Sequence, residues 1–146
     1  MFHGGVPMKI ELENNYEPSE KEEYMKPKHI EFFKRQLLEW KKELIKEAQE
    51  TLDHLKAEKL NEPDPTDRAM AEIEAASELR SRDRYRKLIV KIDHALERIE
   101  DGTYGYCEET GEPIGLRRLR ARPVATFCIE AQERHEKHKK LHSEDD

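Results

Sequence analysis

Two prolines divide the central part of the chain into two long stretches with helical periodicity. Pro63 and Pro65 cannot donate a backbone hydrogen bond and disfavour α geometry in the residue before them, so a helix cannot continue through residues 61–65. On each side of this break, apolar residues recur mostly at steps of three and four, which places them on one face of a helix. The first series is Ile30, Phe33, Leu37, Trp40, Leu44, Ala48, Leu52 and Leu55, and the second is Ala69, Ile73, Ala76, Leu79, Leu88, Ile92, Ala95 and Ile99.

The matched series predict a long antiparallel hairpin coiled coil over residues 29–101, with its tip at 61–69. Folding the chain about Asp64 brings Leu55 opposite Ile73 and Trp40 opposite Leu88, with Phe33 opposite Ala95. The predicted fold class is therefore mainly α. At the tip, Asp64 and Asp67 are suited to capping the second helix, because aspartate accepts hydrogen bonds from the free N–H groups at a helix start.

Composition favours solvated helices over one large core. Hydrophobic residues make up 35% of the chain and charged residues 41%, and the net charge is −6. An acidic chain is poorly suited to binding DNA through its overall field. The two cysteines, together with the lack of an apolar span or leader, predict a cytoplasmic protein with no membrane partner.

One part of the second helix is strongly basic and departs from the apolar pattern. Asp83 stands where the series expects a core residue, and Arg84, Arg86, Lys87 and Lys91 follow it. Two interpretations stay open. The stretch is a solvated face that pairs with Glu43 and Glu47 of the first helix, or it binds phosphate or an acidic partner.

The ends of the chain carry weaker signals. Residues 1–17 read as a mobile acidic segment, and Ser19 with Glu22 resembles a capping box that begins a short helix over 18–28, ended by Pro27. This helix is expected to pack against a small module at 102–128, built from turns and two short strands. A C-terminal helix and acidic tail occupy 129–146. The histidines of this helix indicate an exposed basic face or a metal site, and they are His135, His138 and His142.

The small module contains half of a zinc-ligand set. A ribbon with two C-x2-C half-sites holds zinc through four sulfurs. Here the half-sites read Cys107 with Thr110 and Cys128 with Ala131, so each has kept one sulfur and lost the other. The sequence predicts a ribbon-like module without zinc. Its two thiols then act as small buried residues or form a disulfide on oxidation.

Several motifs together resemble the DksA/TraR family of transcription factors. The bend reads Asp64-Pro65-Thr66-Asp67-Arg68-Ala69, which resembles the family's D-x-x-D-x-A tip. The stretches 78–84, 105–108 and 114–123 also look like the family, and the resemblance covers residues 20–140 in the right order. The incomplete ribbon is similar to that of zinc-independent DksA variants.

The resemblance implies a monomeric, non-enzymatic regulator that binds RNA polymerase through its secondary channel without contacting DNA. Its acidic tip, Asp64 and Asp67 with Ala69, would act near the catalytic centre and destabilise open promoter complexes. The family also implies guanosine tetraphosphate (ppGpp), an effector of the stringent response, bound together with polymerase. The matching positions are Leu88, Lys91 and Arg122, with Arg84 nearby, whereas Gln132 replaces a lysine that is common in the family.

Two other classes of protein stay open. A ribbon that binds nucleic acid is supported by Arg117, Arg118, Arg120 and Arg122, although these arginines could equally hold the ribbon against acidic surfaces. A scaffold coiled coil would use the apolar face for self-association instead of an internal hairpin. An enzyme is not expected, because the chain has no phosphate-binding glycine loop, no nucleophile paired with a base and no complete metal site.

Overall fold

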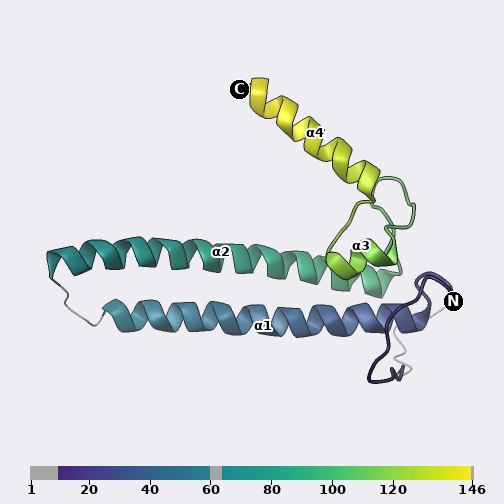
Figure 1. The fold of residues 1–146 in the computed structure, drawn as a ribbon, viewed down its shortest axis with the longest axis horizontal. Coiled ribbons are helices and arrows are strands. Elements are labelled where there is room, and N and C mark those ends of the chain that lie inside the picture. The colour runs from purple at the N-terminus through teal and green to yellow at the C-terminus, as the bar shows by residue number, and fades with distance from the viewer. Residues whose placement is uncertain (1–9, 60–63, 146) are drawn as a thin grey trace. The chain divides into compact units, whose positions relative to one another are not determined.

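The computed structural model describes residues 10–59 and 64–145, and four helices account for most of them. They are α1 (Pro27–Lys59), α2 (Pro65–Asp101), α3 (Leu116–Ala121) and α4 (Ile129–Asp145) (Figure 1). Residues 1–9 of the expected lead-in and 61–63 of the expected tip lie outside the described residues. No helix within the described ranges is long and apolar enough to cross a membrane.

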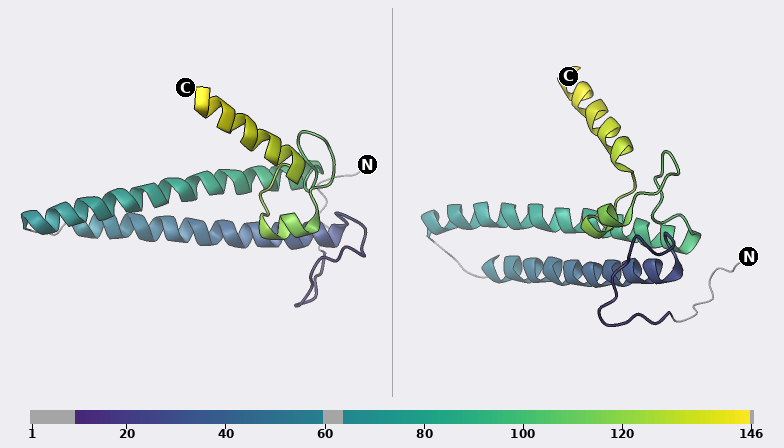
Figure 2. Two further views of the ribbon diagram at one scale, coloured as in Figure 1. Left: turned by 45° about the horizontal axis from the view of Figure 1, so that its top comes forward. Right: turned by 45° about the vertical axis from the view of Figure 1, so that its right-hand side comes forward.

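The chain divides into two compact units. One comprises Leu38–Asp93 and the other comprises the residues up to Leu37 together with those from His94 onward. In the Leu38–Asp93 unit, α1 and α2 run antiparallel and side by side (Figure 2). Contacts between basic side chains and carboxylates join the two helices. Lys41 Nζ lies 2.6 Å from Asp93 Oδ1, and His54 Nδ1 lies 2.6 Å from Glu78 Oε1. The hairpin coiled coil expected from the sequence is therefore confirmed.

The apolar series of α1 is confirmed along its whole length. Phe33, Leu37 and Leu44 are buried, and the other members of the series are half-buried. In α2 the prediction holds only for the C-terminal part, where Ile92 and Ala95 are buried.

The prediction of a buried face is wrong for the N-terminal half of the α2 series. Ile73 is 67% exposed and Leu79 is 52% exposed, and Ala69 and Ala76 are exposed too. The inward positions are instead small or polar, and they are Ala71, Ala75, Glu78, Arg82 and Tyr85. Leu55 therefore does not face a buried Ile73. Its neighbour His54 contacts Glu78, which lies more than one helical turn beyond Ile73 along α2. Asp83 does not interrupt the core, since it is exposed and pairs with Lys87 at 3.1 Å.

The other unit has a core built from the start of α1, the end of α2 and the ribbon module. Phe33 of α1 is fully buried, and its ring centroid lies 5.8 Å from that of Tyr104. The Tyr104 hydroxyl donates to Pro123 O at 2.8 Å. From α3, Leu116 and Leu119 complete this core.

The ribbon module has turns where two strands were expected. In the described residues its only sheet-like pairing is the bridge between Tyr106 and Pro113, and Leu116 begins α3 instead of ending a strand. Positive φ angles at Gly105, Gly111 and Gly115 turn the backbone too often for a strand to extend. Buried Arg98 of α2 then holds the turns, since it donates to the carbonyl oxygens of residues 103 and 106.

The short helix expected over 18–28 is absent. Residues 20–25 form turns and bends, and Pro27 begins α1 instead of ending an earlier helix. This correction follows from the preference of proline for the first helical position, where its missing N–H costs nothing. The segment still packs on the ribbon module. The Tyr24 hydroxyl donates to Gly105 O at 2.7 Å and accepts from the Gly115 N–H at 2.9 Å.

Glu22 contacts several residues of this segment, and its carboxylate should make the stability of the protein depend on pH in the acidic range. The Ser19 N–H donates to Glu22 Oε1 at 2.9 Å. That bond, with contacts from Tyr16, Lys26 and His29, lowers the pKa of Glu22 from 4.5 to about 2. Because the folded-state pKa is the lower one, this stabilisation is present above pH 4.5 and is lost as the pH falls toward 2.

We predict that Glu22→Gln lowers stability at neutral pH and makes it less sensitive to acid. Urea unfolding at about pH 6 and about pH 3.5 measures both effects, because the carboxyl group of the unfolded chain begins to bind its proton within this interval, whereas that of the folded protein does not. Wild type should lose more free energy of unfolding over that interval than Glu22→Gln does. An equal loss in the two proteins would contradict the assignment.

Candidate functional site

Two exposed aspartates stand at the N-terminus of α2. Asp64 immediately precedes the helix, and its Oδ1 accepts the N–H of Asp67 at 2.8 Å. The Asp64 carbonyl oxygen accepts the Arg68 N–H at 2.8 Å. This is the geometry of an N-cap followed by proline at the first helical position. Asp64, not Asp67, therefore performs the capping that the sequence left open between them.

Asp67 has a different role in the local structure. It lies in the first turn of α2 and is exposed, as is Ala69. Its backbone N–H is satisfied by Asp64, whereas its carboxylate contributes the negative charge that favours a helix N-terminus. The Asp-Pro pair already signals Asp64 as the cap, because aspartate before a first-turn proline is the common arrangement.

The basic stretch of α2 is a solvated surface. Arg84 lies over the Tyr85 ring at 5.5 Å, and a shallow groove of about 500 Å³ is lined by Leu79, Arg80, Asp83, Arg84 and Lys87. The ion pair that the structure gives in this groove is Lys87 with Asp83 inside α2. A pairing with Glu43 and Glu47, one of the two interpretations that stayed open, is not among the ion pairs of the described residues.

The residues that match the family's nucleotide site belong to both units. Arg84 and Lys91 are exposed on α2 and Leu88 is half-buried. Arg122 is exposed at the end of α3, where its N–H donates to Arg118 O at 2.8 Å. On α4 the Gln132 amide donates to Glu136 at 3.0 Å.

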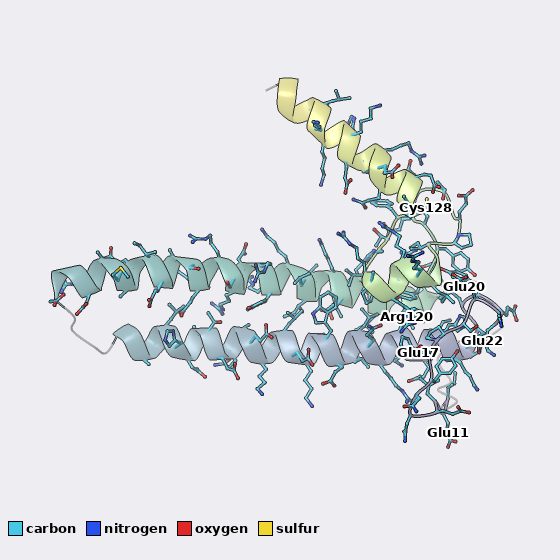
Figure 3. All side chains as sticks on the ribbon, in the orientation of Figure 1. Glu11, Glu17, Glu20, Glu22, Arg120 and Cys128 are labelled. Atoms are coloured by element: carbon cyan, nitrogen blue, oxygen red, sulfur yellow. The ribbon has the colours of Figure 1, made fainter. Side chains whose placement is uncertain are left out.

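Two of the four ribbon arginines bind within their own unit. Arg118 Nε donates to Phe127 O at 3.0 Å, and Arg120 pairs with Glu17 at 3.3 Å (Figure 3). Arg117 is exposed. Arg120 therefore holds the ribbon to an acidic segment, whereas Arg118 bonds within the ribbon module.

The four ribbon positions do not fit a structural zinc ion. Cys107 and Cys128 are buried free thiols, while Thr110 supplies a hydroxyl, 3.9 Å from Cys128 Sγ, and Ala131 supplies only a methyl group. Within the described ranges no three histidine, cysteine, aspartate or glutamate side chains gather in a way that could hold a metal. A closed tetrahedral zinc site needs four donors of this kind.

The surroundings of the Cys107 thiol lower its pKa. Burial of this thiol opposes ionisation, but the Thr110 hydroxyl and the backbone groups of Cys128, Thr110 and Glu109 outweigh it and lower the pKa of Cys107 to about 6. A sulfur that accepts several hydrogen bonds is stabilised as a thiolate.

We predict that the purified protein carries no stoichiometric zinc and keeps its helices and melting temperature in a chelator. Two thiols without further ligands bind zinc too weakly to couple the metal to folding. Elemental analysis and thermal melts with and without chelator measure this. One zinc per chain, or a lower melting temperature in chelator, would contradict it.

The fold and these sites define a helical-hairpin protein with an acidic tip and a small ribbon module. Residues 29–99 match the family described as the N-terminal domain of the DnaK suppressor protein DksA, and residues 102–137 match the prokaryotic dksA/traR C4-type zinc finger. The chain belongs to the DksA/TraR family.

Similar proteins align with four fifths or more of this chain. The chain is 57% identical over 132 residues to the RNA polymerase-binding transcription factor DksA of Caulobacter vibrioides, covering 90% of this chain and 93% of that one. Identity to the DksA of Escherichia coli is 46% over 117 residues, covering 80% and 78%. The solved structure of transcription factor DksA2 from Pseudomonas aeruginosa matches with a TM-score of 0.74 and 44% identity, covering 80% of this chain and 90% of that one.

Proposed function

We propose that this protein regulates transcription by binding RNA polymerase. Its hairpin enters the secondary channel, and Asp64 and Asp67 act near the catalytic centre to destabilise open promoter complexes. The observation that carries this proposal is the pair of exposed aspartates at the N-terminus of α2, only one of which is needed as a cap. The names of the relatives support polymerase as the partner.

Physical chemistry makes this mechanism reasonable without covalent catalysis. A hairpin only two helices wide can reach a metal-dependent active site that a globular domain cannot enter. Negative charge brought there perturbs bound Mg²⁺ or the basic groups beside it. The protein then acts as a monomeric, cytoplasmic regulator and not as an enzyme, in keeping with relatives that are named as transcription factors.

We also propose ppGpp as an effector shared with polymerase. Its two pyrophosphate groups need charge-assisted hydrogen bonds from several cations. Lys91 and Arg122, with Arg84 nearby and Leu88 as an apolar contact, would supply this chain's share. Gln132 removes one positive charge from the set, so the response to the nucleotide should be weaker than with a lysine at that position.

The proposed nucleotide site predicts that two variants lose their response to ppGpp. Lys91→Ala and Arg122→Ala should lose the enhancement by ppGpp and keep basal inhibition, since both side chains are exposed and leave the core intact. Gln132→Lys should strengthen the response. Transcription with and without the nucleotide measures all three, and an unchanged response in Lys91→Ala and Arg122→Ala would remove these residues from the site.

A second candidate function is nucleic-acid binding by the ribbon, favoured by exposed Arg117 and Arg122. One set of assays separates it from the proposed function and from a self-associating scaffold. Binding to polymerase, binding to duplex DNA and sedimentation of the protein alone are measured beside transcription from a ribosomal RNA promoter. The proposal expects polymerase binding and altered transcription by a monomer. DNA binding without polymerase binding would favour the ribbon alternative.

A further inference from the structure

Two histidines in the last turns of α4 lie against each other. His138 and His142 are four residues apart, which places them one turn apart on the same side of the helix. Their ring centroids are 4.4 Å apart and the ring planes are tilted by 51°. Both side chains are exposed.

This pair differs from the other described histidines, each of which contacts a glutamate. The distances are 3.3 Å for His29 with Glu22, 2.6 Å for His54 with Glu78, 2.6 Å for His94 with Glu108 and 2.9 Å for His135 with Glu109. In these four histidines a ring nitrogen already contacts a carboxylate oxygen of the protein. In the same described part of the chain, His138 and His142 have each other as ring neighbours.

The spacing of the two rings is close to that of a metal chelate. A zinc–imidazole bond is about 2.0–2.1 Å long, so a ring centroid lies about 3.2 Å from the metal; two such rings at about 90–109° have centroids about 4.5–5.2 Å apart. The observed 4.4 Å lies just below this range.

We propose that His138 and His142 form a binding site for a divalent late transition metal ion, with water completing the coordination. Imidazole suits zinc, nickel and copper, whereas magnesium, calcium and manganese prefer oxygen donors. The lysines beside the pair, Lys137 and Lys139, disfavour hard cations that bind through charge alone. The site is separate from the ribbon positions and uses two protein ligands.

Nickel is the probe, because it binds imidazole strongly and does not oxidise the thiols of Cys107 and Cys128. Every protein in the comparison carries His3→Ala, since a histidine at the third position of a free amino terminus binds nickel by itself. Calorimetric titration at about pH 7.5, where an ordinary imidazole is neutral, should give one ion per chain.

The variants separate the pair from the other histidine of α4. His138→Ala and His142→Ala should each weaken nickel binding by about tenfold or more, which corresponds to about 1.4 kcal/mol. His135→Ala should bind as the parent does. A swap that combines His142→Ser with Ser143→His keeps the composition but moves the ring to a different face, so it should bind as weakly as His142→Ala.

A structural readout accompanies the titration. Nickel should slow amide hydrogen exchange in residues 138–142 of the parent and leave the swap variant unchanged, because a chelate across one turn stabilises the helix between its ligands. The proposal is overturned if the parent binds no nickel, or if the swap variant or His138→Ala binds as tightly as the parent. Circular dichroism of each variant confirms that α4 is formed.

Discussion

Asp67→Asn should give a protein that folds, binds polymerase and fails to inhibit its target promoter. Asp64 caps α2, so loss of the Asp67 carboxylate removes only a favourable charge in the first turn, worth about 0.3–1 kcal/mol. If the carboxylate acts inside polymerase, the same change should abolish most of the inhibition. Transcription from a ribosomal RNA promoter, measured beside polymerase affinity and thermal stability, tests all three statements.

Asp64 provides matched controls for this prediction. Asp64→Asn keeps the cap, because asparagine caps a helix about as well as aspartate, whereas Asp64→Ala loses it at about 1 kcal/mol. A loss of regulation in Asp64→Asn without a loss of stability would assign the effect to charge. Normal inhibition by the combined Asp64→Asn and Asp67→Asn protein would exclude the acidic tip as the active element.

Gly105→Ala should be among the most destabilising single substitutions in the ribbon module. The backbone there has φ +93°, and a Cβ would lie 2.6 Å from Met25 Sδ and 2.7 Å from Met25 Cγ. Backbone strain of about 1–2 kcal/mol adds to an overpacking cost of about 1–3 kcal/mol. We expect the free energy of unfolding to fall by about 2–5 kcal/mol, measured by denaturant titration.

Gly111→Ala separates the two causes. Gly111 has φ +76° and open space around the added Cβ, so it reports strain without the clash. Its cost should stay at about 1–2 kcal/mol. If the two substitutions lower the free energy of unfolding equally, the close approach to Met25 adds nothing to the cost of Gly105→Ala. The packing of the segment before α1 on the ribbon module would then be wrong.

The sequence predicts the hairpin well where apolar residues alone mark the buried face. The series of α1 contains large side chains at almost every inward position, and all of them are buried or half-buried. In the N-terminal half of α2, Ile73 and Leu79 suggested a face that the structure exposes. Periodicity could not reveal this, because the inward positions there include glutamate and arginine, which helical patterns normally assign to solvent, and because Ala71 and Ala75 give no stronger apolar signal than Ala69 and Ala76.

The sequence indicated candidate residues for the site but not their roles in the local structure. The order of motifs along the chain was enough to indicate the family. The order of motifs does not show that Asp64 alone caps α2; the local signal for that role is the Asp64-Pro65 pair, and the hydrogen bond from the Asp67 N–H shows it directly. The prediction of strands in the ribbon module was wrong for a different reason. Turns at glycines with positive φ replace the extended backbone that alternating residues suggest.

The most direct test of the account places a radical source at the catalytic centre of polymerase. Fe²⁺ substituted for the catalytic Mg²⁺ generates hydroxyl radicals that cut only the protein chain close to it. With this protein bound, the account predicts cuts confined to residues 61–69, which disappear when a competing secondary-channel ligand is added. Binding without cuts in that range, or cuts centred on the ribbon module at 102–128, would contradict the claim that the tip acts near the catalytic centre.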